Sequence, residues 1–453
     1  MKKAKKSLVI LGSGESGVGA ALLGQYLGYA VFVSDKGQVK EKYIAELDAA
    51  GIAWEEGSHS ENRILNADLI IKSPGISEKT PLVQAALEKN IPVIGEIEFG
   101  FQHAGKCRIV AITGTNGKTT TTNLTWHLLH YAGLPARMGG NVGNAFARMV
   151  LDDLKAGKTS DAERIFVLEV SSFQLDDCRK FRPQISILLN ITPDHLDRYG
   201  YELDNYVSSK FQIAQNQKRG DLFISNADDP IIQARMQAQP DVIPCKSAWV
   251  RAKDLRNGYV RIGQQYAFDL SSTKLKGPHN AFNAACAIRV ALRYGVACEK
   301  IEEALYYFTP PAHRMELVSE YMGIRWINDS KATNVDAVFY ALQAMDQPTV
   351  WIVGGQDKGN DYSPLIPLVK QRVSAIVCMG LDNSKILAAF QHLKKPMVET
   401  RSALDAVKAA RQLAEAGDTV LLSPACASFD LFKNYEDRGE QFKQAVLGMM
   451  NDE

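Results

Sequence analysis

A lysine and a threonine that follow a glycine turn have the clearest chemical potential in this chain. They belong to the stretch RIVAITGTNGKTTTT at residues 108–122. Its apolar first part predicts a strand buried on both faces, and the residues after the turn predict the start of a helix. Gly114 and Gly117 permit close backbone approach, Lys118 supplies a positive charge, and the Thr119 hydroxyl can ligate magnesium. The stretch is therefore predicted to bind the phosphates of ATP.

The spacing of the two glycines departs from the general phosphate-loop motif. That motif has four residues between its glycines, whereas only Thr115 and Asn116 lie between Gly114 and Gly117. An ordinary glycine turn with a chance Lys-Thr pair is the alternative. We favour the phosphate loop because the turn lies directly between a predicted strand and a predicted helix.

Two further stretches carry polar groups at the ends of apolar strands, where α/β sheets bind ligands. In FVLEVSS at residues 166–172, Glu169 is the one carboxylate, and its burial requires a partner or a metal. A glutamate facing solvent is the alternative. ILLNITPDHLDR at residues 187–198 runs into a loop with Asp194, His195 and Asp197, for which a solvated turn is the alternative. On the helix that follows, composition alone predicts that Lys210 is a surface lysine.

The N-terminal region has the layout of a nucleotide-binding βαβ unit. A strand at residues 8–11 precedes the glycine turn GSGESG, and a helix leads to a second strand that ends at Asp35. An acidic residue at this position can reach a ribose. A further strand at residues 69–72 runs into Ser73, Pro74 and Gly75, which either touch the same ligand or form a plain turn.

The last third of the chain contains strands at residues 326–328, 349–353, 375–379 and 419–422, which alternate with helices such as residues 404–416. This alternation predicts another parallel sheet. Polar clusters at residues 328–333, 354–358 and 423–428 follow three of the strands and predict a binding face. Before this region, Asn280 and Asn283 share one helical face, where two amides can contact a nucleobase, although N-capping is the commoner role of asparagine.

With 453 residues, the chain is too long for one hydrophobic core. We expect an α/β protein of three domains, with a short linker near residues 97 and 98 and a second linker in TPPAHR at residues 309–314. These domains are a Rossmann-like N-terminal domain (residues 1–97), a central P-loop ATPase-type domain (residues 98–311) and a C-terminal Rossmann-like domain (residues 312–453).

Composition excludes several classes of protein. The net charge is +1, which gives no electrostatic basis for binding nucleic acid. The seven cysteines show no Cys-x-x-Cys spacing, which argues against structural zinc or a disulfide framework. No apolar run is long enough for a membrane span, and the apolar run after the N-terminal lysines is too short for a signal peptide. A cytoplasmic protein is expected.

Together these motifs resemble the Mur ligase family, ATP-dependent enzymes that form amide bonds in peptidoglycan precursor synthesis and share this short glycine spacing. The resemblance covers nearly the whole chain. The motifs LEVSSFQL, HLDRY, YVSSK, HRMELV, NDSKATN and SPACASFDLFKNYEDRG are most similar to the member that adds D-glutamate to UDP-N-acetylmuramoyl-L-alanine. The Asp-Asn-Pro-Arg motif of the member that adds meso-diaminopimelate or lysine is missing from the third domain.

The resemblance implies a role for each matched residue. The residues implied for ATP are Gly114, Thr115, Asn116, Gly117, Lys118, Thr119, Thr120, Asn280, Asn283, Arg314 and Asp329. Those implied for two Mg²⁺ ions are Thr119, Glu169, His195 and a carbamylated Lys210, and the catalytic set is Lys118, His195 and Lys210. Those implied for the UDP-linked substrate are Ser16, Asp35, Ser73, Pro74, Gly75 and Asn141. Those implied for D-glutamate are Lys331, Thr333, Lys358, Ser428 and Phe429.

The chain departs from the family pattern at Glu15, where an apolar residue is usual, at residues 36 and 37, and at Tyr435, where some members have phenylalanine. The implied reaction has two steps: the L-alanyl carboxylate attacks the γ-phosphate of ATP, and the D-glutamate amine then displaces phosphate. A monomer with small-molecule partners is expected.

Three alternatives are weaker. Folylpolyglutamate synthetase usually begins with its ATP domain. A nucleotide-dependent oxidoreductase leaves the second phosphate loop unexplained. A nucleotide sensor predicts ATP binding without turnover.

Overall fold

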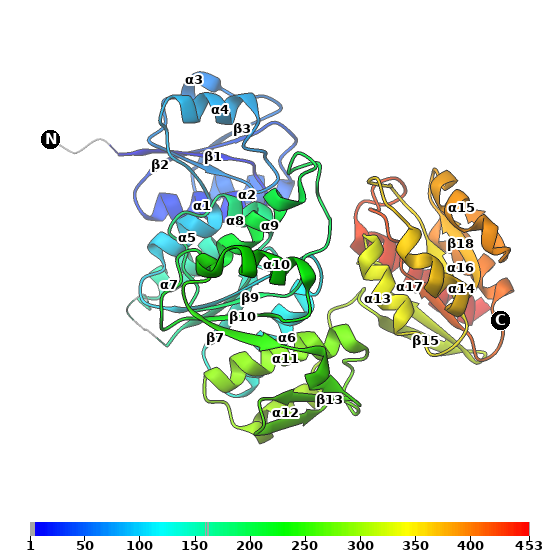
Figure 1. The fold of residues 1–453 in the computed structure, drawn as a ribbon. Helices are drawn as coiled ribbons and strands as arrows, with labels where there is room; N and C mark the ends of the chain where they lie inside the picture. Colours follow the sequence, from blue (N-terminus) through cyan, green and yellow to red (C-terminus); the bar gives the residue numbers. More distant parts are fainter. Residues whose placement is uncertain (1–4, 159, 161–162, 453) are drawn as a thin grey trace. The chain divides into compact units, whose positions relative to one another are not determined.

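The computed structural model describes residues 5–158, 160 and 163–452. Strands and helices alternate along the chain and build three sheets of mainly parallel strands (Figure 1), which confirms the predicted α/β class. The chain divides into two compact units. One contains residues 1–269 with 282–307, and the other contains residues 270–281 with 308–453.

The first unit begins with a five-stranded parallel sheet in the order β3-β2-β1-β4-β5. The strands are β1 (Ser7–Leu11), β2 (Ala30–Asp35), β3 (Ala53–Glu56), β4 (Leu69–Lys72) and β5 (Val93–Gly95). The intervening helices are α1 (Glu15–Tyr26), α2 (Glu41–Ala49), α3 (Glu61–Ile64) and α4 (Pro81–Glu88). β1 is central because residues 8–11 are apolar and buried. The first glycine turn therefore lies in the middle of the carboxyl edge.

The second sheet of this unit has six parallel strands in the order β11-β10-β9-β6-β8-β7. The strands are β6 (Arg108–Thr113), β7 (Ala136–Gly140), β8 (Ile165–Glu169), β9 (Ile185–Leu188), β10 (Leu222–Asn226) and β11 (Lys246–Val250). The helices are α6 (Lys118–Tyr131), α7 (Phe146–Lys155), α8 (Ser172–Asp176), α9 (Leu203–Phe211), α10 (Pro230–Ala238), α11 (Pro278–Arg293) and α12 (Cys298–Tyr307). Because β6 pairs with both β8 and β9, the loops after these three strands meet at one edge.

One hydrophobic core joins the first and second sheets. It contains Leu8 of β1, Phe146 of α7 and Leu168 of β8, all fully buried. The linker expected near residues 97 and 98 lies inside helix α5 (Glu96–His103) instead. Glu98 of this helix is completely buried and accepts hydrogen bonds from the backbone N–H groups of residues 179–181. The chain thus passes from one sheet to the next through a buried helix, and the three-domain division stays a prediction.

A small antiparallel sheet of β12 (Leu255–Arg256), β13 (Tyr259–Ile262) and β14 (Tyr266–Asp269) follows the second sheet. The sequence patterns did not indicate this small sheet. Residues 270–281 then belong to the second unit, although the predicted boundaries place them in the central domain. Helix α11 begins within this segment and continues into the first unit.

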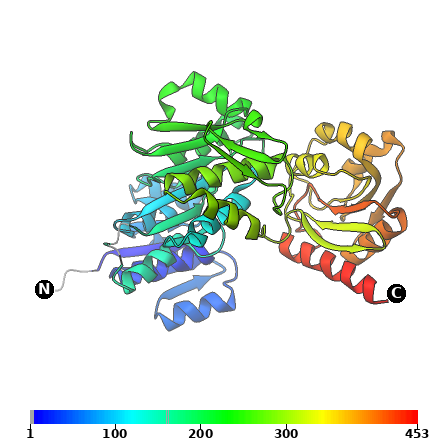
Figure 2. The ribbon, with the colours of Figure 1, turned by 90° about the horizontal axis from the view of Figure 1, so that it is seen from below.

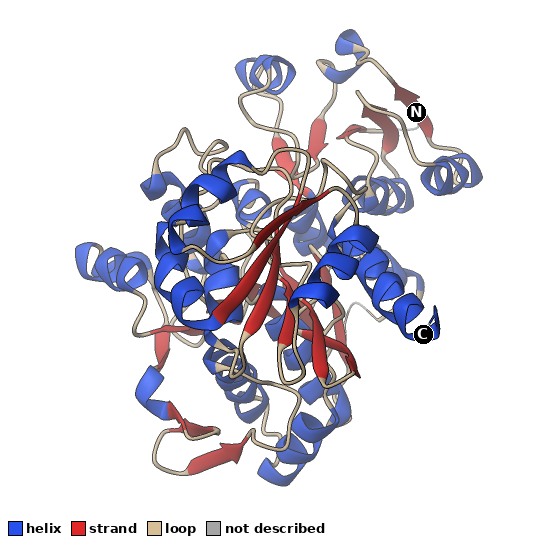
Figure 3. Cartoon of the chain, turned by 90° about the vertical axis from the view of Figure 1, so that its right-hand side faces the viewer, coloured by secondary structure: helices blue, strands red, loops and turns tan. Residues whose placement is uncertain are grey.

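The second unit contains a six-stranded sheet in the order β15-β16-β20-β17-β18-β19. The strands are β15 (Glu316–Tyr321), β16 (Ile324–Asn328), β17 (Thr349–Val353), β18 (Val373–Met379), β19 (Met397–Thr400) and β20 (Thr419–Leu422). The helices are α13 (Val335–Gln343), α14 (Ile366–Arg372), α15 (Ser384–Phe390), α16 (Ala403–Leu413) and α17 (Tyr435–Asp452), and Figure 3 shows helices on both sides of the strands. Only the edge strand β15 is antiparallel within this described sheet, and α17 packs beside it (red in Figure 2).

Helices on both faces give this sheet two separate cores, one around Trp351 and one around Trp326. Across the residues that the structure describes, no helix is both long and apolar enough to cross a membrane.

Candidate active site

The predicted phosphate loop connects β6 to α6. Gly117 caps α6 in the left-handed conformation (φ +83°), and a Cβ atom there would lie 2.6 Å from the Asn283 amide oxygen. A side chain at this position would therefore be strained and would collide. The Lys118 ammonium donates hydrogen bonds to the carbonyl oxygens of Gly114 at 2.8 Å and Thr115 at 2.7 Å. The loop, its lysine and Asn283 are thus brought together.

The loop after β9 fixes the phosphate loop from the side. The Asn116 N–H donates to the Asn190 side-chain oxygen at 2.8 Å, and the Asn190 amide donates back to the Asn116 carbonyl at 3.1 Å. The Thr192 N–H donates to the Thr115 hydroxyl at 3.0 Å. The sequence analysis did not select Asn190 or Thr192, although both directly follow a predicted strand. These hydrogen bonds fix the conformation of the phosphate loop before a ligand binds.

A cavity of about 320 Å³ lies beside the phosphate loop. The predicted site residues that line it are Pro74, Gly75, Thr115, Lys118, Asn141, His195 and Lys210. Its other lining residues are Ser171, Ser172, Phe173, Asp194 and Tyr206. The neighbouring positions of β6, β8 and β9 explain why residues far apart in the sequence meet here.

Glu169 ends β8 and is only 2% exposed, so the alternative of a glutamate facing solvent is wrong. Its Oε1 accepts a hydrogen bond of 2.9 Å from the Asn141 side chain, which lines the cavity. Its buried Oε2 accepts no hydrogen bond from the residues that the structure describes. A buried carboxylate oxygen without a donor is costly unless a cation satisfies it.

Lys210 is 1% exposed, so the prediction of a surface lysine from composition is wrong. Tyr206 and Lys210 lie one helical turn apart on α9 and both face inward, with the ammonium 4.5 Å from the centre of the Tyr206 ring. Burial, together with the positive charge of Lys118, holds the pKa of Lys210 well below its usual value of 10.5. The amine is therefore more readily neutral than a surface lysine.

His195 occupies the left-handed backbone region (φ +53°), which is uncommon outside glycine and often found at functional sites. Its Nε2 lies 3.7 Å from the Asp194 carboxylate, and its ring packs edge-on against Phe173 at 5.2 Å between centroids. All three side chains line the cavity.

The first sheet contributes a second group of predicted residues. Asp35 accepts hydrogen bonds from the Ser13 N–H at 2.7 Å, the Ser13 hydroxyl at 2.6 Å and the Gly37 N–H at 2.8 Å. Burial raises the pKa of Asp35, but these hydrogen bonds outweigh it and the pKa falls below its usual value. Sequence reasoning missed Ser13, although it lies inside the glycine turn.

The turn after β4 approaches this glycine turn closely. A Cβ atom on Gly12 (φ +96°) would lie 2.5 Å from the Ser73 hydroxyl, so the two turns are brought together as expected. Ser16 lies half-buried in the first turn of α1. Glu15, which departs from the family pattern, pairs with Arg148 of α7 at 2.9 Å and so joins the first glycine turn to the second sheet.

In the second unit, Asp329 follows β16 and accepts hydrogen bonds from the Ser423 hydroxyl at 2.9 Å and the Met315 N–H at 3.2 Å. Burial raises its pKa to about 7, although these bonds and the charge of Arg314 oppose the rise. The Lys331 ammonium lies 3.5 Å from the centre of the Tyr435 ring. Tyr435, where some family members have phenylalanine, thus contacts a residue predicted to bind D-glutamate.

The remaining residues predicted for D-glutamate lie in the turns after β16, β17 and β20. Thr333 follows Lys331, Ser428 is buried, and Lys358 and Phe429 are exposed. The buried Arg438 holds all three turns: its guanidinium donates to the carbonyls of Ser330 at 2.8 Å, Cys426 at 3.2 Å and Gly354 at 3.5 Å. Sequence reasoning assigned it no role, although it lies in the quoted motif EDRG.

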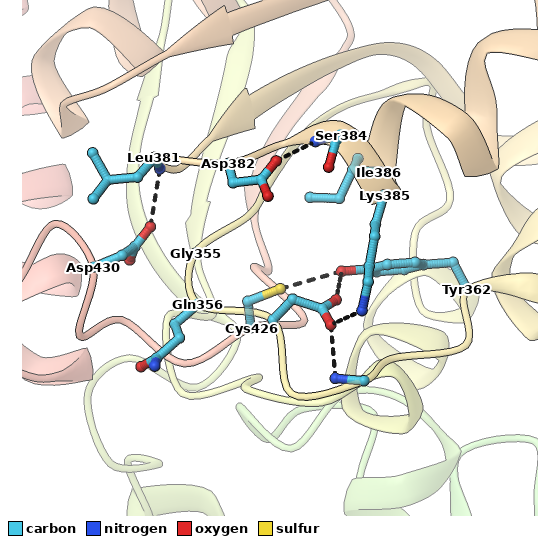
Figure 4. A pocket seen from close by; sticks show the side chains of 12 residues that line it. Gly355, Gln356, Tyr362, Leu381, Asp382, Ser384, Lys385, Ile386, Cys426 and Asp430 are labelled. Atoms are coloured by element: carbon cyan, nitrogen blue, oxygen red, sulfur yellow. Dashed lines mark hydrogen bonds and ion pairs between the residues drawn. The ribbon is translucent and has the colours of Figure 1, made fainter.

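A second cavity of about 380 Å³ lies at the carboxyl ends of β17, β18 and β20 (Figure 4). The Asp357 carboxylate accepts hydrogen bonds from the Lys385 ammonium at 2.7 Å and from the Tyr362 hydroxyl at 3.0 Å. Asp430, labelled in Figure 4, accepts a hydrogen bond from the Leu381 N–H at 3.1 Å. Asp357 precedes Lys358, and Asp430 follows Phe429. This cavity therefore lies next to the turns predicted to bind D-glutamate.

The predicted residues thus form two groups, one in each compact unit. The phosphate loop, Asn283, the predicted metal ligands and the residues of the first sheet belong to the first unit. Asn280, Arg314, Asp329 and the residues predicted for D-glutamate belong to the second.

Comparison with known proteins gives three matches along the chain. A Mur ligase MurD-like N-terminal domain matches residues 6–95. A Mur ligase middle domain matches residues 112–291, and the glutamate ligase domain of Mur ligases matches residues 313–426.

Two relatives are named UDP-N-acetylmuramoylalanine--D-glutamate ligase. The protein of Christiangramia forsetii is 48% identical over 98% of this chain and 100% of its own length. The protein of Cytophaga hutchinsonii is 46% identical over 98% of this chain and 99% of its own length.

Solved structures with the same fold include two proteins of Thermotoga maritima. The UDP-N-acetylmuramate-alanine ligase is 20% identical, with a TM-score of 0.60 over 99% of this chain and 100% of that chain. The MurF ligase in complex with ADP is 16% identical, with a TM-score of 0.60 over 92% of this chain and 95% of that chain. At these identities the likeness concerns the fold alone.

Proposed function

Because the chain belongs to the Mur ligase family, we propose that it is an ATP-dependent ligase that joins D-glutamate to UDP-N-acetylmuramoyl-L-alanine in peptidoglycan precursor synthesis. The full-length relatives named UDP-N-acetylmuramoylalanine--D-glutamate ligase support both this reaction and D-glutamate as the amino acid that is added. The observation that carries the proposal is the cavity of the first unit. It brings Lys118, Lys210 and the Pro74–Gly75 turn to the same place.

For ATP, the proposal uses the phosphate loop from Gly114 to Thr120, with Lys118 as its fixed cation. The loop amides and the N-terminus of α6 favour the triphosphate, and Lys118 balances charge that develops on the transferred phosphoryl group. Asn283, which lies beside Gly117, would contact the nucleoside. Asn280, Arg314 and Asp329 of the second unit are assigned to ATP by the family resemblance alone.

We propose that two Mg²⁺ ions bind to residues of the first unit. The buried Oε2 of Glu169 is without a hydrogen bond among the described residues, and His195 and the Thr119 hydroxyl stand at the same edge of the sheet. No cluster of three or more His, Cys, Asp or Glu side chains that could hold a metal occurs in the described part of the chain. This suits magnesium, which takes few protein ligands and completes its shell with water and substrate phosphates. When bound, the ions neutralise phosphate charge.

We also propose that Lys210 carries a carbamate. Carbamylation requires a neutral amine to attack carbon dioxide, and the lowered pKa of Lys210 increases that fraction. The step forms a bond between the amine nitrogen and the carbon of carbon dioxide and releases a proton, and it would give the side chain an anionic oxygen ligand.

The proposed reaction proceeds in two steps. The substrate carboxylate attacks the γ-phosphorus in line, which forms an acyl phosphate and releases ADP. The D-glutamate amine, after losing a proton, then attacks the acyl carbon and releases inorganic phosphate. We propose that His195, or a neighbouring carboxylate such as Asp194, accepts that proton; both side chains line the cavity of the first unit.

The substrates would bind in the two groups of residues already described. Ser16, Asp35, Ser73, Pro74 and Gly75 would hold the UDP part, and Asn141 would contact the muramoyl part. Lys331, Thr333, Lys358, Ser428 and Phe429 would hold D-glutamate.

The remaining organisation is likewise part of the proposal. We divide the chain into domains of residues 1–97, 98–311 and 312–453, supported by three family matches in that order. We further propose that the protein acts as a monomer in the cytoplasm.

Phosphate release from ATP and Mg²⁺ in the presence of UDP-N-acetylmuramoyl-L-alanine tests the function. D-glutamate, L-glutamate, L-alanine and a diamino acid are compared as acceptors. Release with D-glutamate alone is expected. Release with another acceptor would refute the specificity, and no release with any would refute the ligase.

A further inference from the structure

One arginine side chain binds three successive carbonyl groups of the turn after β4. The Arg198 guanidinium donates to the carbonyl oxygen of Pro74 at 2.9 Å, of Gly75 at 3.0 Å and of Ile76 at 2.8 Å. A guanidinium can do this because its donors form a rigid planar fork, whereas a lysine ammonium is a point charge on a flexible stem. Arg198 lies in the loop after β9, so these bonds connect the first sheet to the second.

The same guanidinium also packs on a wall of the cavity beside the phosphate loop. Its central carbon lies 4.7 Å from the centre of the Phe173 ring, and Phe173 in turn packs against His195. Pro74, Gly75, Phe173 and His195 all line this cavity. Arg198 thus contacts lining residues of the cavity from both sheets: Pro74 and Gly75 from the first sheet, and Phe173 from the second.

A buried lysine supports the turn from its other end. The Lys72 ammonium donates to the Ile76 carbonyl at 2.9 Å and forms an ion pair of 2.6 Å with Asp177, which follows α8. Lys72 is only 2% exposed. Two cations from different sheets therefore hold the Ile76 carbonyl, and the position of the turn depends on the second sheet.

We propose that Arg198 is a positioning residue for the UDP-linked substrate, which acts by fixing residues 74–76 against the reaction cavity. This inference rests on the proposed function, because that function assigns the turn to this substrate. The phosphate loop is held by Asn190 and Thr192 rather than by Arg198, so we expect ATP binding not to depend on Arg198.

Arg198→Lys and Arg198→Gln test the proposal, with Arg182→Lys as the matched control. Arg182 makes a two-point ion pair with Asp221 at 2.9 and 3.0 Å, and both residues precede strands of the second sheet, whereas Arg198 follows one. We expect both Arg198 variants to raise the KM for the UDP-linked substrate roughly tenfold or more, the effect of about one charged hydrogen bond. The KM for ATP stays within about twofold in all three variants.

Hydrogen exchange and calorimetric titration provide readouts that do not need turnover. The amides of residues 73 and 75–77 should exchange faster in the Arg198 variants, while those of β6 remain unchanged. Direct titration should show weaker binding of the UDP-linked substrate. Unchanged exchange and unchanged substrate affinity would overturn the positioning role, whereas a wild-type protein that fails to bind this substrate would refute the proposed function itself. A variant that loses ATP affinity equally would show general unfolding and also contradict the proposal.

Discussion

The Asn141 side chain donates a 2.9 Å hydrogen bond to one oxygen of the buried Glu169 carboxylate, and the other oxygen receives none from the described residues. This arrangement fixes the carboxylate while leaving one oxygen for a cation. We expect Glu169→Gln to raise the Mg²⁺ concentration needed for half-maximal activity by roughly 10–100-fold or more. Replacing a residue that only supports a metal ligand already has an effect of that size. A magnesium titration of the initial rate measures this. An unchanged magnesium requirement would mean that Glu169 is not a ligand.

Lys118 is the subject of the second prediction. Lys118→Ala removes the ammonium that contacts Gly114 and Thr115, so the turnover of ATP should fall by roughly 10²–10³-fold or more. The exposed Lys155 provides the control, because Lys155→Ala removes an equal charge from the surface. Near-normal turnover in the Lys118 variant would exclude the loop from the active site.

Lys210→Ala should be severely impaired and partly rescued by formate or acetate, because a small carboxylate can replace the carbamate oxygen in the vacated space. The control is Lys218→Ala, which changes an exposed lysine. Activity of the native enzyme should also fall when dissolved carbon dioxide is removed. If Lys210→Ala retains full activity, or if no carboxylate rescues it, the carbamate role is wrong.

Glu96 should make stability depend on pH. It is completely buried, and burial with the nearby Glu15 charge raises its pKa from 4.5 to about 7, despite a hydrogen bond from the Ala147 N–H. The folded state therefore holds this proton more tightly than the unfolded state. The contribution of Glu96 to the free energy of unfolding is complete below pH 4.5 and is lost as the pH rises through about 7. The loss amounts to up to about 3 kcal/mol.

Glu96→Gln should remove this dependence and leave the variant more stable than the native protein at pH 8. Urea unfolding at pH 5 and pH 8 measures it, with Glu88→Gln as a control at an exposed position. A native protein whose free energy of unfolding is equal at both pH values would contradict the assignment.

Much of the fold follows from local sequence patterns. β6 and β8 are continuous apolar runs, as central parallel strands are, and the glycine turns mark where they end. The phosphate loop was predictable because its function depends on neighbouring residues. The antiparallel strands β12 to β15 were missed. The strands β12 to β14 are short, and β15 has six residues but none of them is fully buried, so neither group forms a continuous apolar run.

The burial of single polar residues could not be predicted in the same way. Lys210 lies in an amphipathic helix, where a lysine usually faces water, and only tertiary packing shows that it faces inward. Arg198 and Arg438 donate to backbone carbonyls far away in the sequence. Every residue type has a backbone carbonyl, so the sequence cannot show which carbonyl an arginine will contact. For these residues, only the resemblance or the structure provides the information.

The hydrophobic core that the first two sheets share also limits how this protein can be taken apart. A fragment that begins at residue 98 would expose the apolar faces of α5 and α7 that now meet α1. Limited proteolysis should therefore not separate the first sheet from the second as two stable fragments. An exchange of the first sheet with that of a related enzyme would succeed only if the incoming sheet also matched the packing surfaces of α1, α5 and α7. Packing, rather than substrate chemistry, therefore limits recombination between relatives at this boundary.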